Sequence, residues 1–141
     1  MAAVEWGMTD PSRRVRSHRD LIVWQRGLEL VDETYSSTDR FPPREQYGIT
    51  AQMRAAAVSI PANIAEGHGR HTTREFLRFL AIANGSLREL DTYYEVSLRR
   101  KYATPAELGS LGNLMDEVGR MLSGLRSALT RKAVKTLPPA P

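Results

Sequence analysis

Apolar residues recur at intervals of three and four positions along four separate stretches of this chain. The last stretch is the most regular, and its apolar residues are Leu108, Leu111, Met115, Val118, Leu122, Leu125 and Leu129. Such spacing places apolar side chains along one face of an α-helix. One helix cannot bury its apolar face alone. Four such stretches therefore predict a fold in which the apolar faces of four helices pack against one another.

The other three stretches show the same spacing. Residues 19–37 carry Leu21, Trp24, Leu28, Val31 and Tyr35; residues 44–66 carry Ile49, Met53, Ala56, Ala57, Ile60 and Ile64; residues 72–98 carry Phe76, Leu80, Ala83, Leu87, Leu90, Tyr94 and Leu98. No alternating run of β-branched residues bounded by turn residues is present, so a sheet is not expected. The predicted fold class is all-α, an up-down-up-down antiparallel four-helix bundle over residues 18–132. Residues 1–17 and the proline-rich residues 133–141 lack this period, so we expect a flexible N-terminal tail and a disordered C-terminal tail.

Two Thr-x-x-Glu sequences predict helix starts. They are Thr72 with Glu75 and Thr104 with Glu107, and each pair can satisfy two of the backbone N–H groups at a helix N-terminus. Pro105 occupies the first helical position after Thr104, where a missing N–H costs nothing. We therefore expect the third and fourth helices to begin at these threonines.

Two residues of the second stretch affect its predicted helix. Pro61 lacks a backbone N–H and leaves the carbonyl of Ala57 without its helical partner, which predicts a kink. Gly67 predicts the helix end, in the left-handed conformation that glycine adopts without strain. The same region carries a polar stripe that could meet a matching stripe in the third stretch. The residues of this structural polar network are Ser59, Asn63, Glu66, Ser86 and Glu89, and ligand binding is the alternative interpretation.

Small residues mark one flank of the fourth stretch. Gly112 and Gly119 are one heptad apart, and Asp116 and Ser123 continue their stripe. Each glycine costs about 0.8–1 kcal/mol relative to alanine inside a helix. A close helix contact would offset this cost, and we predict a contact between subunits here, with an exposed face of loose composition as the alternative. The acidic segment 20–39 is the expected counterpart, since it carries Asp20, Glu29, Asp32, Glu33 and Asp39 against Arg26 alone.

Arginine dominates the basic residues. The chain has 20 basic and 16 acidic residues, a net charge of +4, and 17 of the basic residues are arginine. A guanidinium matches phosphate oxygens in geometry, although a GC-rich genome also encodes arginine often. Several arginines lie opposite the apolar face of the third stretch. The candidate nucleic-acid-binding residues are Arg70, Arg74, Arg78, Arg88 and Arg99, with Arg13, Arg14 and Arg16 of the N-terminal tail.

Catalytic and membrane functions are not expected. The chain has no cysteine, and its histidines are His18, His68 and His71, of which the last two lack a third metal ligand at useful spacing. We therefore expect no metal, no cofactor and no enzymatic activity. The longest uncharged stretch, Ala55 to Ala65, is too short to cross a membrane. The first twenty residues lack the apolar segment of a signal peptide, so we expect a cytoplasmic protein.

Four ordered motifs carry a resemblance to a known family. They are Leu21-Ile22-Val23-Trp24-Gln25, Phe41-Pro42-x-x-Glu45-x-Tyr47-Gly48, Ser59-Ile60-Pro61-Ala62-Asn63-Ile64-Ala65-Glu66-Gly67 with Arg70, and Phe76-x-x-Phe79-Leu80-x-Ile82-Ala83-x-Gly85-Ser86-Leu87-x-Glu89-Leu90. Over about residues 18–130 the chain resembles the bacterial four-helix-bundle proteins encoded by intervening sequences within 23S ribosomal RNA genes. The same family includes the accessory variability determinant of diversity-generating retroelements.

The resemblance implies a four-helix bundle that assembles as a ring-shaped homopentamer and binds RNA or DNA through a positively charged surface. In the retroelement branch it implies a reverse transcriptase as a further partner. Members of the family are not known as enzymes. The chain departs from the family pattern at His68 and in its glycine-rich fourth stretch. The residues leave open a second function, a structural or protein-interaction module without nucleic-acid binding, in which the arginines pair with acidic partners.

Overall fold

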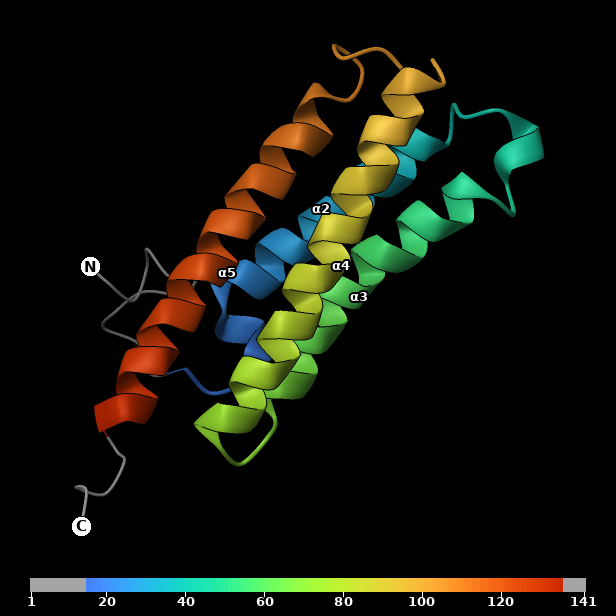
Figure 1. Cartoon of the computed structure of the whole chain (residues 1–141). Coiled ribbons are helices and arrows are strands. Elements are labelled where there is room, and N and C mark those ends of the chain that lie inside the picture. The colour runs from blue at the N-terminus through green and yellow to red at the C-terminus, as the bar shows by residue number, and fades with distance from the viewer. Residues whose placement is uncertain (1–14, 136–141) are drawn as a thin grey trace.

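The structure is a computed structural model, and it describes residues 15–135. Its four α-helices and two short 3-10 helices are η1 (His18–Asp20), α2 (Ile22–Thr38), η2 (Pro43–Glu45), α3 (Ile49–His68), α4 (Thr73–Arg99) and α5 (Gly109–Lys135). The four α-helices lie side by side and successive helices run in opposite directions (Figure 1). Helix α3 packs against α2 and α4, and α5 packs against the same two helices. This arrangement is the predicted all-α, up-down-up-down four-helix bundle.

The apolar faces of α3, α4 and α5 form the core as predicted. On α5, every residue of the predicted face is buried, from Leu108 just before the helix to Leu129. On α3 and α4 the central residues are buried, namely Met53, Ala56, Ala57, Ile60, Ile64, Leu80, Ala83, Leu87 and Leu90. The ends of these two faces, including Ile49, Phe76 and Leu98, are partly buried and pack against the core. Regular spacing of large apolar residues was therefore sufficient to identify the buried face of these three helices.

The predicted buried face of α2 is wrong in part. Leu28 and Tyr35 are 41% and 43% exposed, whereas Gly27, Leu30 and Thr34 are buried. Gly27 lies against α3, where a Cβ at this position would come within 3.2 Å of Pro61 Cβ. The buried hydroxyl of Thr34 donates to the carbonyl of Leu30 at 2.7 Å, so no polar group is left unpaired there. The face with Gly27, Leu30 and Thr34 is thus turned to the core, and the side chains of Leu28 and Tyr35 face outward.

The predicted starts of the second and fourth helices are wrong, and that of the third is confirmed. The second helix does not begin at Arg44, because residues 43–45 form the separate helix η2 and α3 begins at Ile49. Gly48 precedes α3 with φ −103° and ψ −122°, outside the helical region, which separates the two helices. Both threonine caps are confirmed. The Thr72 hydroxyl accepts from the Glu75 N–H at 3.1 Å.

The Thr104 cap is reciprocal. The Thr104 hydroxyl accepts from the Glu107 N–H at 3.2 Å, and the Glu107 carboxylate accepts from the Thr104 N–H at 2.9 Å. The bond from the Thr104 backbone N–H to the Glu107 carboxylate is the largest cause that lowers the pKa of Glu107, and the Thr104 side chain acts in the same direction. Residues 105–108 nevertheless form turns, and the continuous helix α5 begins at Gly109. The cap therefore forms as predicted, one turn ahead of the regular helix.

The predicted role of Gly67 is wrong. Helix α3 continues through it to His68, and Gly69, the residue after the helix, has φ −77° and ψ −5°, so no left-handed end is formed at this place. Gly67 is buried because the first turns of α4 cross it closely. A Cβ at Gly67 would come within 2.7 Å of Phe79 Cβ and 3.0 Å of Phe76 Cδ1. This glycine permits two helices to approach, and its conformation within the helix is ordinary.

The glycines of α5 also have contacts within the chain. A Cβ at Gly112 would come within 2.9 Å of the Tyr94 hydroxyl, and one at Gly119 within 3.3 Å of Leu87 Cδ2. These two glycines therefore permit a close contact between α4 and α5 of one chain, and the contact between subunits through the same flank stays a prediction. The predicted domain limits can be compared only in part, since residues 1–14 and 136–141 lie outside the described residues. Val15 packs against the core, and α5 extends past residue 132 to Lys135.

Candidate nucleic-acid interface

Helix α4 presents its arginines to solvent because its apolar residues occupy the opposite face. Arg74, Arg88 and Arg99 are all exposed. Among residues 15–135, no acidic side chain lies within ion-pair distance of these three arginines. Their positive charges are therefore not neutralised by a direct partner, and they follow the full length of one helix.

Arg70 and Arg78 have a different environment. Arg70 pairs with Glu66 at 3.0 Å, and Arg78 lies 3.7 Å from Glu75. Both guanidinium groups lie over the ring of Phe79, at 4.8 Å and 5.2 Å from its centre. These contacts hold the two side chains in place and offset part of their charge. The five arginines predicted around α4 thus divide into three without an acidic partner and two that are paired.

The predicted arginines of the N-terminal tail are described only in part. Arg13 and Arg14 lie outside the described residues. Arg16 is exposed, and its backbone N–H donates to the Asp20 carboxylate at 2.8 Å, which ties this residue to η1.

The predicted polar network is smaller than expected. The hydroxyls of Ser59 on α3 and Ser86 on α4 are 2.8 Å apart and hydrogen-bonded. The amide of Asn63 donates to the Ser59 hydroxyl at 3.0 Å and to the Ser59 carbonyl at 2.8 Å. This amide therefore binds the carbonyl of Ser59 rather than the carbonyl of Ala57 that Pro61 leaves free. Three side chains form a polar link between α3 and α4.

Two predicted members stand apart from this link because they are on exposed positions. Glu66 pairs with Arg70, one turn further along the chain. Glu89 accepts a hydrogen bond from the Tyr93 hydroxyl at 2.9 Å, and this bond raises the pKa of Tyr93. Both carboxylates therefore have partners of their own on the surface.

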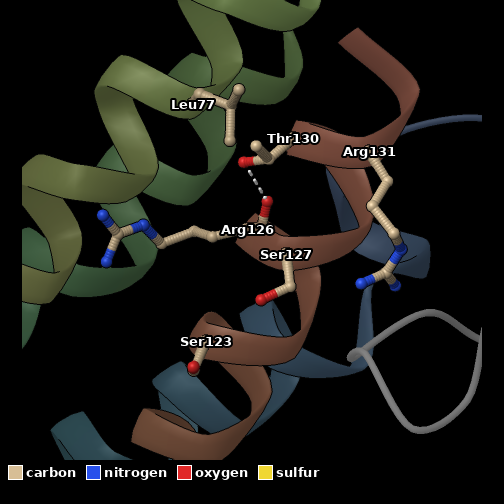
Figure 2. A pocket seen from close by; sticks show the side chains of 6 residues that line it. All are labelled: Leu77, Ser123, Arg126, Ser127, Thr130 and Arg131. Carbon is tan, nitrogen blue, oxygen red and sulfur yellow. Dashed lines mark hydrogen bonds between the residues drawn. The ribbon is translucent and has the colours of Figure 1, made fainter. Parts of the chain in front are cut away.

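Two hollows lie between α4 and α5. The first, of about 560 Å³, is lined by Leu77, Ser123, Arg126, Ser127, Thr130 and Arg131 (Figure 2). The second, of about 230 Å³, is lined by Asn84, Leu87, Arg88, Asp91, Met115, Asp116 and Gly119. Arg126 and Arg131 were not among the arginines predicted from the sequence, because that prediction followed the arginines around α4 and these two are on α5. A sequence feature that could have indicated them is the position of Ser123, Ser127 and Thr130, which fall between the two arginines on the surface of α5.

An apolar depression of about 680 Å³ lies on the outer face of α2 and α3. Its lining includes Tyr35, Tyr47, Ala51, Ala55 and Val58. Tyr47 is 89% exposed and Val58 is 44% exposed. The exposed residues Leu28 and Asp32 lie on the same side of α2 as Tyr35, since all three are three or four positions apart. Arg54 also lines the depression, so large apolar side chains are gathered here beside one arginine of α3, with Asp32 on the neighbouring surface of α2.

The histidines do not form a metal site in the described part of the chain. Between residues 15 and 135, no group of three or more histidine, aspartate or glutamate side chains is placed to hold a metal ion. His68 packs edge-on against the ring of Phe76, with ring centres 5.7 Å apart. Burial, followed by the nearby charge of His18, lowers the pKa of His68. In the same described range, no helix is long and apolar enough to span a membrane.

The fold and this surface define an all-α four-helix bundle whose third long helix carries a row of exposed arginines. The sequence of residues 19–124 matches the 23S rRNA-intervening sequence protein family. The chain belongs to this family, whose description names no catalytic activity. Among curated proteins, no relative of similar sequence is found.

One solved structure supports the same fold. It is a protein with unknown function from the S23 ribosomal protein family of Bacteroides thetaiotaomicron, with a TM-score of 0.65 and 23% sequence identity. The alignment covers 73% of this chain and 97% of that one. At this identity the similarity concerns the fold.

Proposed function

We propose that this protein is a non-enzymatic, oligomeric nucleic-acid-binding protein whose interface with RNA or DNA is the outer face of α4. The observation that carries the proposal is the exposure of Arg74, Arg88 and Arg99 without acidic partners among the described residues. Exposed arginines that form no ion pair within the chain keep their donors available, and a row of them favours a polyanionic partner.

The length of this row suits a nucleic-acid backbone. At 1.5 Å per residue, Arg74 and Arg99 are separated by about 37 Å along the helix axis. One turn of duplex DNA spans about 34–36 Å, so the row can meet phosphates across about one turn. Aromatic platforms for base stacking are missing among the arginines of this face. We therefore expect backbone recognition with little dependence on base sequence.

The oligomeric part of the proposal rests on the apolar depression of α2 and α3. Exposed tyrosine and valine side chains in one place favour a protein contact. Exposed acidic residues of α2, such as Asp32, complement the exposed arginines of α4, so the occupant proposed is a second copy of this protein. Five subunits are the number that the family resemblance implies. A reverse transcriptase is the further partner proposed for a member of the retroelement branch.

The test is a binding titration of labelled RNA and DNA at two salt concentrations. The variant Arg74→Gln/Arg88→Gln/Arg99→Gln removes the unpaired row, and Arg40→Gln/Arg44→Gln/Arg120→Gln is the control with the same loss of net charge at other exposed sites. We expect the first variant to bind more weakly and to lower the salt slope by about 0.9 per lost phosphate contact on duplex DNA. The control should stay close to the parent.

Equal binding by the two variants would contradict the proposed interface. In that case a change of oligomeric state in the α4 variant would favour the alternative function, a protein-interaction module in which arginines of α4 meet the acidic α2 of a neighbouring subunit. Circular dichroism of both variants provides the folding control.

A further inference from the structure

We infer that the hollow between the start of α4 and the last third of α5 is a binding site for a phosphate group. All of its polar lining residues are on α5, whereas the arginine row of the proposed interface is on α4. Its lining is Leu77 from α4 and Ser123, Arg126, Ser127, Thr130 and Arg131 from α5. At about 560 Å³ it is within the size range of small-molecule sites.

The lining residues form an ordered arrangement on α5. With 100° between successive residues, the three hydroxyl residues fall between Arg126 on one side and Arg131 on the other. Figure 2 shows the two arginines extending to opposite sides of the helix, with Ser127 between them and Leu77 pointing from α4 toward Thr130. The arrangement is a row of hydroxyls bounded by two cations, with an apolar wall on the side of α4.

Hydrogen-bond donors are available in this hollow. Within residues 15–135, the guanidinium of Arg126 has no acidic partner, and the hydroxyls of Ser123 and Ser127 have no hydrogen bond to the protein. The Thr130 hydroxyl donates to the Arg126 carbonyl at 2.7 Å, which fixes its orientation. A planar guanidinium and two hydroxyls match the acceptor oxygens of a phosphate.

The charge around the hollow favours an anion. No carboxylate lines it, and no acidic residue follows Glu117 anywhere in the sequence. The smaller hollow further along the same two helices differs, because there Arg88 is accompanied by Asp91 and Asp116. Basic residues are also favoured at a helix C-terminus by the helix dipole, but that effect is confined to the last turn, and Arg126 precedes it. The dipole therefore does not account for this arginine.

The phosphate could belong to a free nucleotide or to a nucleic-acid backbone, and the chemistry of recognition is the same. Binding of a nucleic-acid backbone in this hollow rests on the proposed function, whereas binding of a phosphate group as such does not. Phosphate binding in the hollow and nucleic-acid binding by the arginine row of α4 can therefore be tested by different variants of the full chain.

The experiment is a titration of the full chain with inorganic phosphate at constant ionic strength, with chloride as the balancing anion. The arginine Nε–H signals are followed by nuclear magnetic resonance. We expect a saturable shift in the parent and binding weakened at least about tenfold by Arg126→Ala. Ser127→Asp, at an exposed position, places a negative charge in the hollow and should abolish binding without affecting the fold. Arg120→Ala is the control, since this exposed arginine is on α5 but does not line the hollow.

Two competitors identify the source of the phosphate. Displacement of phosphate by a ten-nucleotide RNA, with adenosine monophosphate no better than phosphate, would support binding of a backbone phosphate. Displacement by adenosine monophosphate but not by the RNA would support a free nucleotide. Shifts that chloride reproduces, or equal binding by Arg126→Ala and the parent, would overturn the site. Loss of RNA binding in the α4 variant with phosphate binding retained would leave this site standing while locating RNA binding on α4.

Discussion

Replacing Gly67 with alanine tests how closely α3 and α4 pack. The new Cβ would be 2.7 Å from Phe79 Cβ and 3.0 Å from Phe76 Cδ1, and 3.3 Å from the Phe76 carbonyl oxygen. Carbon atoms without a bond between them prefer about 3.5–4.0 Å, so α4 must move away by several tenths of an ångström. Because the nearest contact is a Cβ, whose position is fixed by the backbone of α4, rotation of a side chain cannot relieve the clash.

The magnitude follows from two opposing effects. Alanine favours a helix over glycine by up to about 1 kcal/mol, and overpacking of a core costs about 1–3 kcal/mol. Gly85→Ala, in the middle of α4, isolates the first effect, since a Cβ there meets nothing within 4 Å. We expect Gly85→Ala to stabilise the fold and Gly67→Ala to be less stable than it by about 1–3 kcal/mol.

Thermal unfolding followed by circular dichroism measures this difference. For a chain of this size, a difference of about 1 kcal/mol in the free energy of unfolding shifts the Tm by roughly 3 °C. Gly69→Ala is a second control at the same end of α3, where a Cβ meets only ordinary contacts, the nearest at 3.5 Å. This control separates the cost of the clash from the effect of position, because alanine gains less over glycine in the last turn of a helix than in its middle. If Gly67→Ala melts at or above the temperature of Gly85→Ala, close approach of the helices is not the reason for this glycine.

Three further predictions concern other contacts. Asn63→Ala removes two hydrogen bonds to Ser59, while the bond between Ser59 and Ser86 remains. Urea unfolding should therefore show that the free energy of unfolding falls by about 0.5–1.5 kcal/mol. An unchanged unfolding midpoint would argue against a structural role of Asn63. The lowered pKa of His68 means that the unfolded chain binds its proton more tightly. The free energy of unfolding should therefore decline as the pH falls from about 6.5 through the lower pKa that His68 has in the folded chain, with His18 and Asp20 as the neighbouring charged groups. The variant His68→Gln should flatten this decline. A decline like that of the parent in this variant would exclude His68 as its source. Light scattering should give a mass that is a multiple of 15.8 kDa for the parent and a smaller mass for Val58→Glu, which changes the apolar depression. Val134→Glu is the control, since it changes another exposed valine in the same way. A parent mass of one subunit would refute self-association.

The sequence by itself determined the fold class and most of the core. The apolar faces of α4 and α5 could be assigned residue by residue because large side chains repeat there without interruption, and the helical period alone sets which of them share a face. The Thr72 and Thr104 caps were equally accessible, since each depends on residues three positions apart. Arg74, Arg88 and Arg99 could be placed on the exposed face of α4 by the same local geometry.

Only the tertiary structure decided which apolar residues of α2 face outward. Leu28 and Tyr35 have the spacing of a buried face, but the contact of Gly27 with Pro61 turns a neighbouring stripe toward the core. The roles of Gly67, Gly112 and Gly119 were hidden for the same reason, because the atoms that a side chain would meet belong to another helix. The hollow beside Arg126 depends on the separation of α4 and α5 as well. Local periodicity determines which face a helix can bury, whereas the fit between helices determines which face it does bury.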